Sequence, residues 1–309
     1  MSSYICTICP RHCGALRDTN TGYGFCGMPA TPIVARAALH YGEEPCISGT
    51  HGSGTVFFSG CSLKCCYCQN HSISHKNEGK TITTERLADI FRELEEAGAH
   101  NINLVTPTHF VPAIVPALER AKELGLGLPV VYNTGTYEAV ETLRMLDGLV
   151  DIWLPDFKYV SPELAARYSF APDYFDVASA ALEEMARQTR GNLFDLDGMM
   201  TRGIIVRHLI LPGCTEDSKA VLKYLWDTYG DDICLSIMDQ YTPLPRIATL
   251  AGGKYKELDR RVTAAEYDDV VNYAVDLGIT NAFVQEGEAA SESFIPDFEH
   301  FDVNAFLER

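Results

Sequence analysis

The stretch Cys61-Ser-Leu-Lys-Cys65-Cys-Tyr-Cys68 lies directly after an apolar segment and decides how the rest of the chain is interpreted. Thiolates are ligands of soft metals and of iron–sulfur clusters. Three thiolates on one short loop can bind three irons of a [4Fe–4S] cluster and leave the fourth iron without a protein ligand. A pure electron carrier usually binds all four irons through cysteine. The C-x3-C-x2-C spacing therefore indicates a cluster at which a further molecule reacts.

Zinc is the alternative occupant of this loop. A structural zinc ion usually takes four protein ligands, typically as two pairs, whereas the loop supplies three thiols in the required spacing. Cys66 interrupts the run and is interpreted as a residue that binds no metal. The number of ligands therefore favours the cluster.

Size and composition limit the class of protein. The chain has 309 residues, which is normal for one α/β barrel, and 46% hydrophobic residues can form a sizeable core. A formal net charge of -17 argues against nucleic acid and anionic membranes as partners. No apolar run is long enough to cross a bilayer, and the first residues lack the features of a signal peptide. We therefore expect a cytoplasmic protein in which the clustered cysteines are metal ligands rather than partners in disulfides.

Strand and helix patterns alternate from residue 55 onward. Strands are predicted over 55–59, 102–106, 129–133, 151–155, 204–211, 233–238 and 280–284. Helices are predicted over 84–97, 113–124, 137–146, 174–190, 217–229 and 264–277. This alternation predicts a parallel sheet with right-handed crossovers, in an open or nearly closed β/α barrel. Sites in such folds lie at the C-terminal ends of the strands, and the Cys61 loop follows the first predicted strand.

Three segments are expected along the chain: a cysteine-rich metal-binding module over 1–46, a barrel over 47–290 and a C-terminal tail over 291–309 that packs on the barrel. The first segment carries four thiols with close spacings, namely Cys6, Cys9, Cys13 and Cys26. This pattern predicts a second metal site, occupied by zinc or by another iron–sulfur cluster. Cysteines that bind no metal are the alternative. Asp197-Gly198 predicts a tight hairpin turn before the fifth strand.

The cysteine run resembles the signature of the radical S-adenosylmethionine (radical SAM) enzymes, and Tyr67 extends the resemblance as the aromatic residue before the last cysteine. The resemblance implies a six-unit partial barrel, (β/α)6. It also implies that the open iron binds SAM. The reduced cluster would then cleave SAM reductively to methionine and a 5′-deoxyadenosyl radical, which takes a hydrogen atom from the substrate.

Within that superfamily, three stretches resemble pyruvate formate-lyase activating enzyme and a group of its homologues. They are the glycines before the cluster loop from Gly49 to Gly60, the run Asp156-Phe-Lys158, and the N-terminal Cys-x2-Cys-Pro-Arg-x-Cys segment. The resemblance implies a flavodoxin or ferredoxin as electron donor and a glycine in a partner protein as substrate. Thr55 or Val56 stands where the activating enzymes usually carry an arginine, so another peptide or a small molecule remains an alternative substrate.

The same resemblance points to residues that hold SAM. Thr106 and Thr108 stand where related enzymes carry a Gly-Gly-Glu stretch, and Asn133 follows the third strand. Lys158 could pair with the carboxylate of SAM and Asp156 could contact its hydroxyls. Each of these polar residues could instead stabilise a loop or cap a helix. Arg207 interrupts an apolar strand, and a buried charge needs partners, so we expect it to face the site.

Together these patterns predict a radical SAM oxidoreductase with a [4Fe–4S] cluster on Cys61, Cys65 and Cys68. Its substrate is a protein that receives a glycyl radical or another molecule, and no catalytic residue is assigned. The alternative is a non-catalytic metal-binding protein or an iron–sulfur electron-transfer protein.

Overall fold

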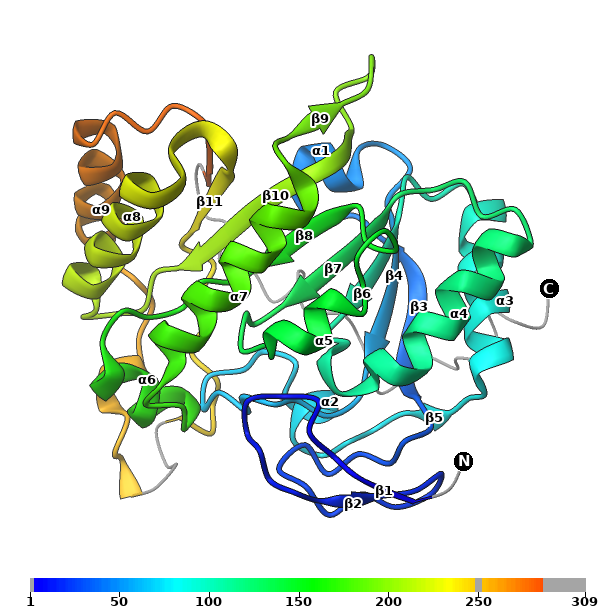
Figure 1. Cartoon of the computed structure of the whole chain (residues 1–309). Helices are drawn as coiled ribbons and strands as arrows, with labels where there is room; N and C mark the ends of the chain where they lie inside the picture. The colour runs from blue at the N-terminus through cyan, green and yellow to red at the C-terminus, as the bar shows by residue number, and fades with distance from the viewer. Residues whose placement is uncertain (1–2, 248–251, 286–309) are drawn as a thin grey trace.

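One curved, mostly parallel sheet forms the centre of the molecule in the computed structural model, which describes residues 3–247 and 252–285 (Figure 1). Across this part of the chain the strands are ordered β12-β11-β10-β8-β7-β6-β4-β3-β5. Their bounds are β3 (Ile33–His40), β4 (Ser53–Phe58), β5 (Lys80–Thr81), β6 (Ile102–Val105), β7 (Val130–Thr134), β8 (Ile152–Pro155), β10 (Met200–Leu209), β11 (Cys234–Met238) and β12 (Ala282–Val284). The sheet confirms the predicted α/β fold class.

The seven strands from β4 to β12 within this order are parallel to their neighbours, as βαβ crossovers require. The helices are α1 (Pro45–Ser48), α2 (His71–Ser74), α3 (Thr84–Glu96), α4 (Val111–Glu123), α5 (Val140–Arg144), α6 (Pro162–Ser169), α7 (Tyr174–Thr189), α8 (Thr215–Tyr229) and α9 (Ala264–Asp276). The longer ones, such as α3, α4 and α7, cover the outer face of the sheet in Figure 1. The inner face of the strands is thereby left to line a site.

Local sequence explains where several elements begin. The Thr83 side chain accepts a hydrogen bond from the backbone of Arg86 at the start of α3. Thr263 and Glu266 form a reciprocal capping box at the start of α9, as their spacing predicts. The short strand β9 (Leu193–Phe194) pairs antiparallel with the start of β10, and Gly198 lies in the turn between them. This pairing confirms the predicted hairpin.

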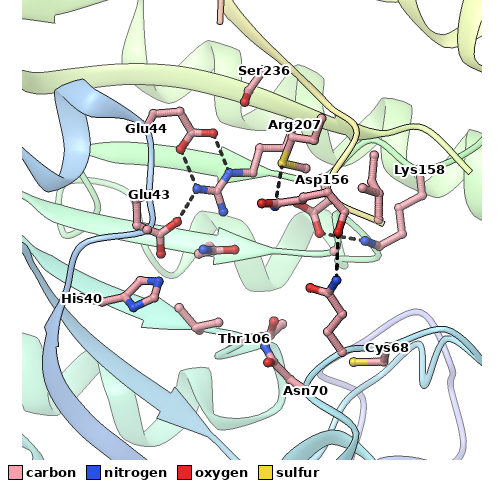
Figure 2. Close-up of a pocket in the computed structure, with 18 of the residues that line it drawn as sticks. His40, Glu43, Glu44, Cys68, Asn70, Thr106, Asp156, Lys158, Arg207 and Ser236 are labelled. Atoms are coloured by element: carbon pink, nitrogen blue, oxygen red, sulfur yellow. Dashed lines mark hydrogen bonds and ion pairs between the residues drawn. The ribbon is translucent and has the colours of Figure 1, made fainter. Parts of the chain in front are cut away.

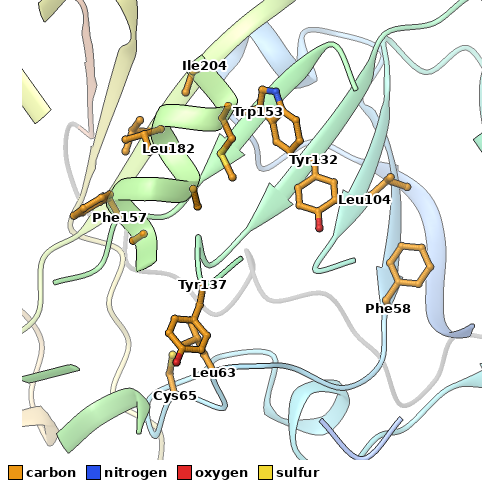
Figure 3. Packing of buried hydrophobic residues seen from close by; sticks show 14 of the residues in the cluster. Phe58, Leu63, Cys65, Leu104, Tyr132, Tyr137, Trp153, Phe157, Leu182 and Ile204 are labelled. Atoms are coloured by element: carbon orange, nitrogen blue, oxygen red, sulfur yellow. The ribbon is translucent and has the colours of Figure 1, made fainter. Parts of the chain in front are cut away.

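Large apolar side chains fill the space between the sheet and its helices (Figure 3). Tyr132 and Trp153, on neighbouring strands, are fully buried with ring centroids 5.1 Å apart. Leu182 of α7 and Ile204 of β10 belong to the same cluster. This packing fixes the strands from which the site residues extend.

The helix predicted over 137–146 is the clearest departure from the sequence prediction. Only α5 (Val140–Arg144) is helical there. The backbone of Thr136 is left-handed, with φ 63°, and the Glu138 carboxylate accepts a hydrogen bond from Thr108, 2.6 Å away. These contacts hold residues 136–139 in a turn. Strand β3 and helix α6 had no counterpart among the predicted elements.

Strand β3 also bears on the predicted organisation of the chain. It lies within the first 46 residues yet pairs with β4 over six residue pairs in the central sheet. The remainder of the N-terminal segment, with the small sheet of β1 (Tyr4–Ile5) and β2 (Leu16–Arg17), lies below the main sheet in Figure 1. The boundary at residue 46 stays a prediction, and the tail over 291–309 lies outside the described residues. No helix in the described ranges has both the length and the apolarity needed to span a bilayer.

Candidate functional site

A cavity of about 480 Å³ opens at the C-terminal ends of the parallel strands (Figure 2). Two segments face each other across it. Residues 40–45 run from the end of β3 to the start of α1, and residues 61–70 carry the cysteines predicted to bind the cluster. Eight of the residues predicted to form the site line this cavity, namely Cys61, Cys65, Cys68, Thr106, Asn133, Asp156, Lys158 and Arg207. The fold therefore brings together residues that are up to 146 positions apart in the chain.

Each of the three thiols in the cluster loop accepts a hydrogen bond. The backbone N–H of Leu63 lies 3.3 Å from Cys61 Sγ, the Ser169 hydroxyl 3.0 Å from Cys65 Sγ, and the Ser74 hydroxyl 3.3 Å from Cys68 Sγ. Donors to sulfur stabilise metal-bound thiolates and tune iron–sulfur clusters. The donor set therefore fits a [4Fe–4S] cluster with one iron open toward the cavity.

Gly60 allows the loop to approach the N-terminal segment. Its φ is 84°, and a Cβ there would lie 2.3 Å from Cγ of Met28. Burial raises the pKa of the Cys68 thiol to about 12, so the protons must leave when a metal binds. Close packing against Met28 thus constrains the start of the loop.

Asp156 and Lys158 form a charged pair on the cavity wall after β8. Lys158 Nζ lies 2.7 Å from Asp156 Oδ2, and the lysine side chain is 16% exposed. Burial acts to lower the pKa of Lys158, but the Asp156 carboxylate outweighs it and the pKa is raised. The ammonium group therefore stays charged and can meet an anionic group of a ligand.

Arg207 faces the cavity, as expected, but its guanidinium is held by two glutamates that the sequence prediction did not include. It donates to both carboxylate oxygens of Glu44, at 2.8 and 2.5 Å, and also to Glu43. The three side chains are between 5 and 12% exposed. A proline two residues after Glu43, at a helix start, was the one sequence signal that could have located them. Contact between Arg207 and SAM stays a prediction.

Tyr67 and Thr108 depart from the expectation that they line a cofactor site. Both are buried and neither lines the cavity. The hydroxyl oxygens of Tyr67 and Tyr159 lie 2.6 Å apart, and Thr108 donates to Glu138. Burial raises the pKa of Glu138 to about 7, although the hydrogen bond from Thr108 acts to lower it. Both residues therefore pack behind the site, where neighbouring polar groups satisfy them.

Arg11, between two cysteines of the N-terminal segment, joins that segment to the cluster loop. Its guanidinium donates to the carbonyls of Ser62, at 2.6 Å, and Ser169, at 2.9 Å, and also to those of Leu63 and Phe170. A guanidinium that donates to four carbonyls, two in the cluster loop and two at the end of α6, holds these segments in one arrangement. The N-terminal segment is therefore a structural neighbour of the cluster loop.

Comparison with protein-family models identifies the family of this chain. A model of the radical SAM superfamily matches residues 55–224, which is more than half of the chain and includes the cluster loop. The chain belongs to the radical SAM superfamily. Membership implies a [4Fe–4S] cluster and SAM as the cofactors of this radical SAM protein, and the donor set above fits them.

This radical SAM protein is similar to another sequence and to solved structures. An uncharacterized protein of Methanocaldococcus jannaschii is 28% identical over 278 residues, covering 87% of this chain and 74% of the relative. Streptococcus suis SuiB, solved with S-adenosylmethionine bound, has a TM-score of 0.50 and 13% identity over 74% of this chain, which spans about half (48%) of SuiB. Methylornithine synthase (PylB) has a TM-score of 0.47 and 18% identity, covering 82% of this chain and 80% of that one. These matches do not support the finer resemblance to pyruvate formate-lyase activating enzyme.

The predicted second metal site consists of four cysteines of the N-terminal segment. Cys6, Cys9 and Cys26 are buried and Cys13 is exposed. No group of three or more His, Cys, Asp or Glu residues within 3–247 and 252–285 has the arrangement of a bound metal ion. A second site, with zinc or another cluster, therefore stays a prediction.

Replacing Cys6, Cys9, Cys13 and Cys26 together with alanine is expected to remove the metal in excess of one cluster and to expose the N-terminal segment to proteases. The segment holds little apolar surface, so a metal would supply much of its folding free energy. Metal analysis and limited proteolysis near residue 40 test this, with Cys214→Ala as control. Unchanged metal content and protease resistance in the quadruple variant would exclude a second site.

Proposed function

We propose that this protein is a radical SAM enzyme in which Cys61, Cys65 and Cys68 bind the cluster and the 480 Å³ cavity holds SAM and the substrate. The observation that carries the proposal is the arrangement of three hydrogen-bonded thiols and a charged pair, Asp156 and Lys158, around one cavity. When bound, the cluster and SAM supply the radical that takes a hydrogen atom from the substrate.

The chain's own residues bind, orient and exclude water. Lys158 offers an ammonium group for the carboxylate of SAM, and Asp156 keeps that lysine in place and offers an acceptor for hydroxyls. Asn133 and Thr106 add polar groups at the ends of the neighbouring strands. Walls formed by buried strands limit access of water, and this protects a reactive intermediate.

The electron donor in this proposal is a flavodoxin or a ferredoxin, and the substrate is a protein, a peptide or a small molecule. Activation of a glycyl-radical protein is one version of it. The non-catalytic alternative, an iron–sulfur electron carrier, is disfavoured because a carrier needs no cavity of about 480 Å³ beside its cluster. Formation of 5′-deoxyadenosine by the reconstituted, reduced protein tests the proposal. A fully reconstituted protein that forms none would contradict it.

Lys158→Ala and Asp156→Ala are each expected to lower the affinity for SAM about tenfold or more. A charge-assisted hydrogen bond contributes about 1.5–3 kcal/mol, and tenfold in affinity is about 1.4 kcal/mol. Equilibrium dialysis with labelled SAM measures the effect on anaerobically reconstituted protein. Lys223→Ala, which removes an exposed lysine of α8, is the control. Wild-type affinity in both cavity variants would remove this pair from the SAM site.

A further inference from the structure

The wall opposite the cluster loop lies outside the residues that the family model matches. Residues 40–45 line the cavity, whereas the family model matches residues 55–224. In Figure 2 Glu43 and Glu44 extend from this wall toward Arg207, and Cys68 and Asn70 lie on the other side. A wall that lies outside the matched residues and faces the cluster loop is where recognition of the substrate is expected.

The charges that line the cavity do not balance. Among the described lining residues the carboxylates are Glu43, Glu44 and Asp156, and the cations are Lys158 and Arg207. Asp156 pairs with Lys158, so two glutamates share one arginine. Glu44 accepts hydrogen bonds from both Nε and Nη2 of Arg207, whereas Glu43 accepts from Nη2 alone. Glu43 is therefore the carboxylate whose negative charge Arg207 compensates less.

His40, on the same wall, does not supply the missing cation. Burial is the largest influence on its pKa and lowers it, so the ring is neutral at pH 7. A buried carboxylate without full compensation is costly, and a cation that enters the cavity would relieve the cost.

Asn103 adds an independent observation beside Glu43. The residue is fully buried on β6, and its Nδ2 donates to Glu43 Oε1 at 2.8 Å. A carboxylate only accepts hydrogen bonds, so the amide must present its nitrogen to Glu43. Its Oδ1 is then buried, and no donor among the described residues reaches it. Asn103 lies two residues before Val105, which lines the cavity, and alternate residues of a strand share a face.

We propose that Glu43, Glu44 and Asn103 form a cation subsite, which binds an ammonium or guanidinium group of the substrate. A positively charged N–H group that enters the cavity compensates the carboxylate in excess, while Asn103, buried behind the cavity wall, holds Glu43 in place. The inference rests on the proposed function for the identity of the reaction and adds the chemical class of its substrate: an amine, a guanidine, or a peptide with a lysine or arginine side chain.

Calorimetric titration of the reconstituted protein with cadaverine, agmatine and valerate tests the subsite. Cadaverine or agmatine is expected to bind, and valerate, an anion of similar length, is not. Glu43→Gln is expected to lower the affinity for the bound cation at least about tenfold. The single amide oxygen of the replacement side chain cannot accept from both Asn103 and Arg207, so a lower melting temperature is expected, and binding is measured well below it. Glu123→Gln, on the exposed side of α4, makes the same change in net charge and serves as the control.

Equal affinity for the cations in wild type and Glu43→Gln, or tighter binding of valerate, would overturn the cation subsite. The affinity for SAM is measured in the same samples. A fall in SAM affinity as large as the fall for cadaverine would assign the excess carboxylate to SAM and also overturn it. Cation binding that depends on Glu43, in a protein that forms no 5′-deoxyadenosine, would support the subsite while the proposed function failed.

Discussion

Replacing Cys61, Cys65 and Cys68 together with alanine is expected to give a colourless protein that holds no cluster and forms no 5′-deoxyadenosine. The three thiols are the cysteines that line the cavity, and each accepts a hydrogen bond suited to a bound thiolate. Loss of all three leaves no thiolate among the described residues that line the cavity. Visible absorbance, electron paramagnetic resonance of the reduced protein and iron analysis measure the result.

Cys66→Ala is the matched control for this experiment. Cys66 stands inside the same run but does not line the cavity, so its loss should preserve the absorbance and the product. The prediction fails if the triple variant retains the iron–sulfur spectrum of the wild type. Zinc alone in a properly reconstituted wild-type protein would also contradict it.

Replacing Arg207 with methionine is expected to cost about 3–5 kcal/mol in the free energy of unfolding. The change removes the partner of two buried carboxylates, and the apolar replacement offers them no donor. Urea denaturation measures the loss. Arg202→Met, an exposed arginine on the same strand, is the control, and a loss no larger than in that variant would show that Arg207 is not needed for stability.

The loss of unfolding free energy in Arg207→Met is expected to become smaller as the pH falls. In the wild type burial acts to raise the pKa of Glu44, but Arg207 outweighs it and the pKa is lowered. Without Arg207 burial acts unopposed, so the pKa of Glu44 in the folded variant rises above the unfolded value. The difference from the wild type is then complete above the raised pKa of the variant and disappears as the pH falls through the lowered pKa of Glu44 in the wild type. Adding Glu43→Gln and Glu44→Gln to the variant should restore stability at neutral pH.

Sequence alone could predict the parallel core and the cluster loop because each depends on local patterns. Apolar strands alternating with helices specify βαβ units, and the spacing of three cysteines specifies a ligand set. Asp156 and Lys158 could be predicted as well, since residues at the C-terminal end of a strand face the site. Both lie in the cavity.

Other features depend on contacts between distant residues, which no local pattern encodes. Strand β3 contains two adjacent alanines and an arginine in place of a clear alternation, so its pairing with β4 is visible only in the folded sheet. Glu43 and Glu44 meet Arg207 across more than 160 positions. Tyr67 follows the family motif in sequence, yet its hydroxyl is directed to Tyr159 in the core.

The contacts of Arg11 have a consequence for how the protein is made. Its bond to Ser62 joins residues 51 positions apart, and its bond to Phe170 joins residues 159 positions apart. Contacts between residues so far apart in sequence form late, because the intervening chain must be ordered first. On the ribosome, the cluster loop cannot reach its final shape until the segment around residue 170 has emerged and folded. Insertion of iron is therefore expected to be a late, post-translational event in the biogenesis of the enzyme.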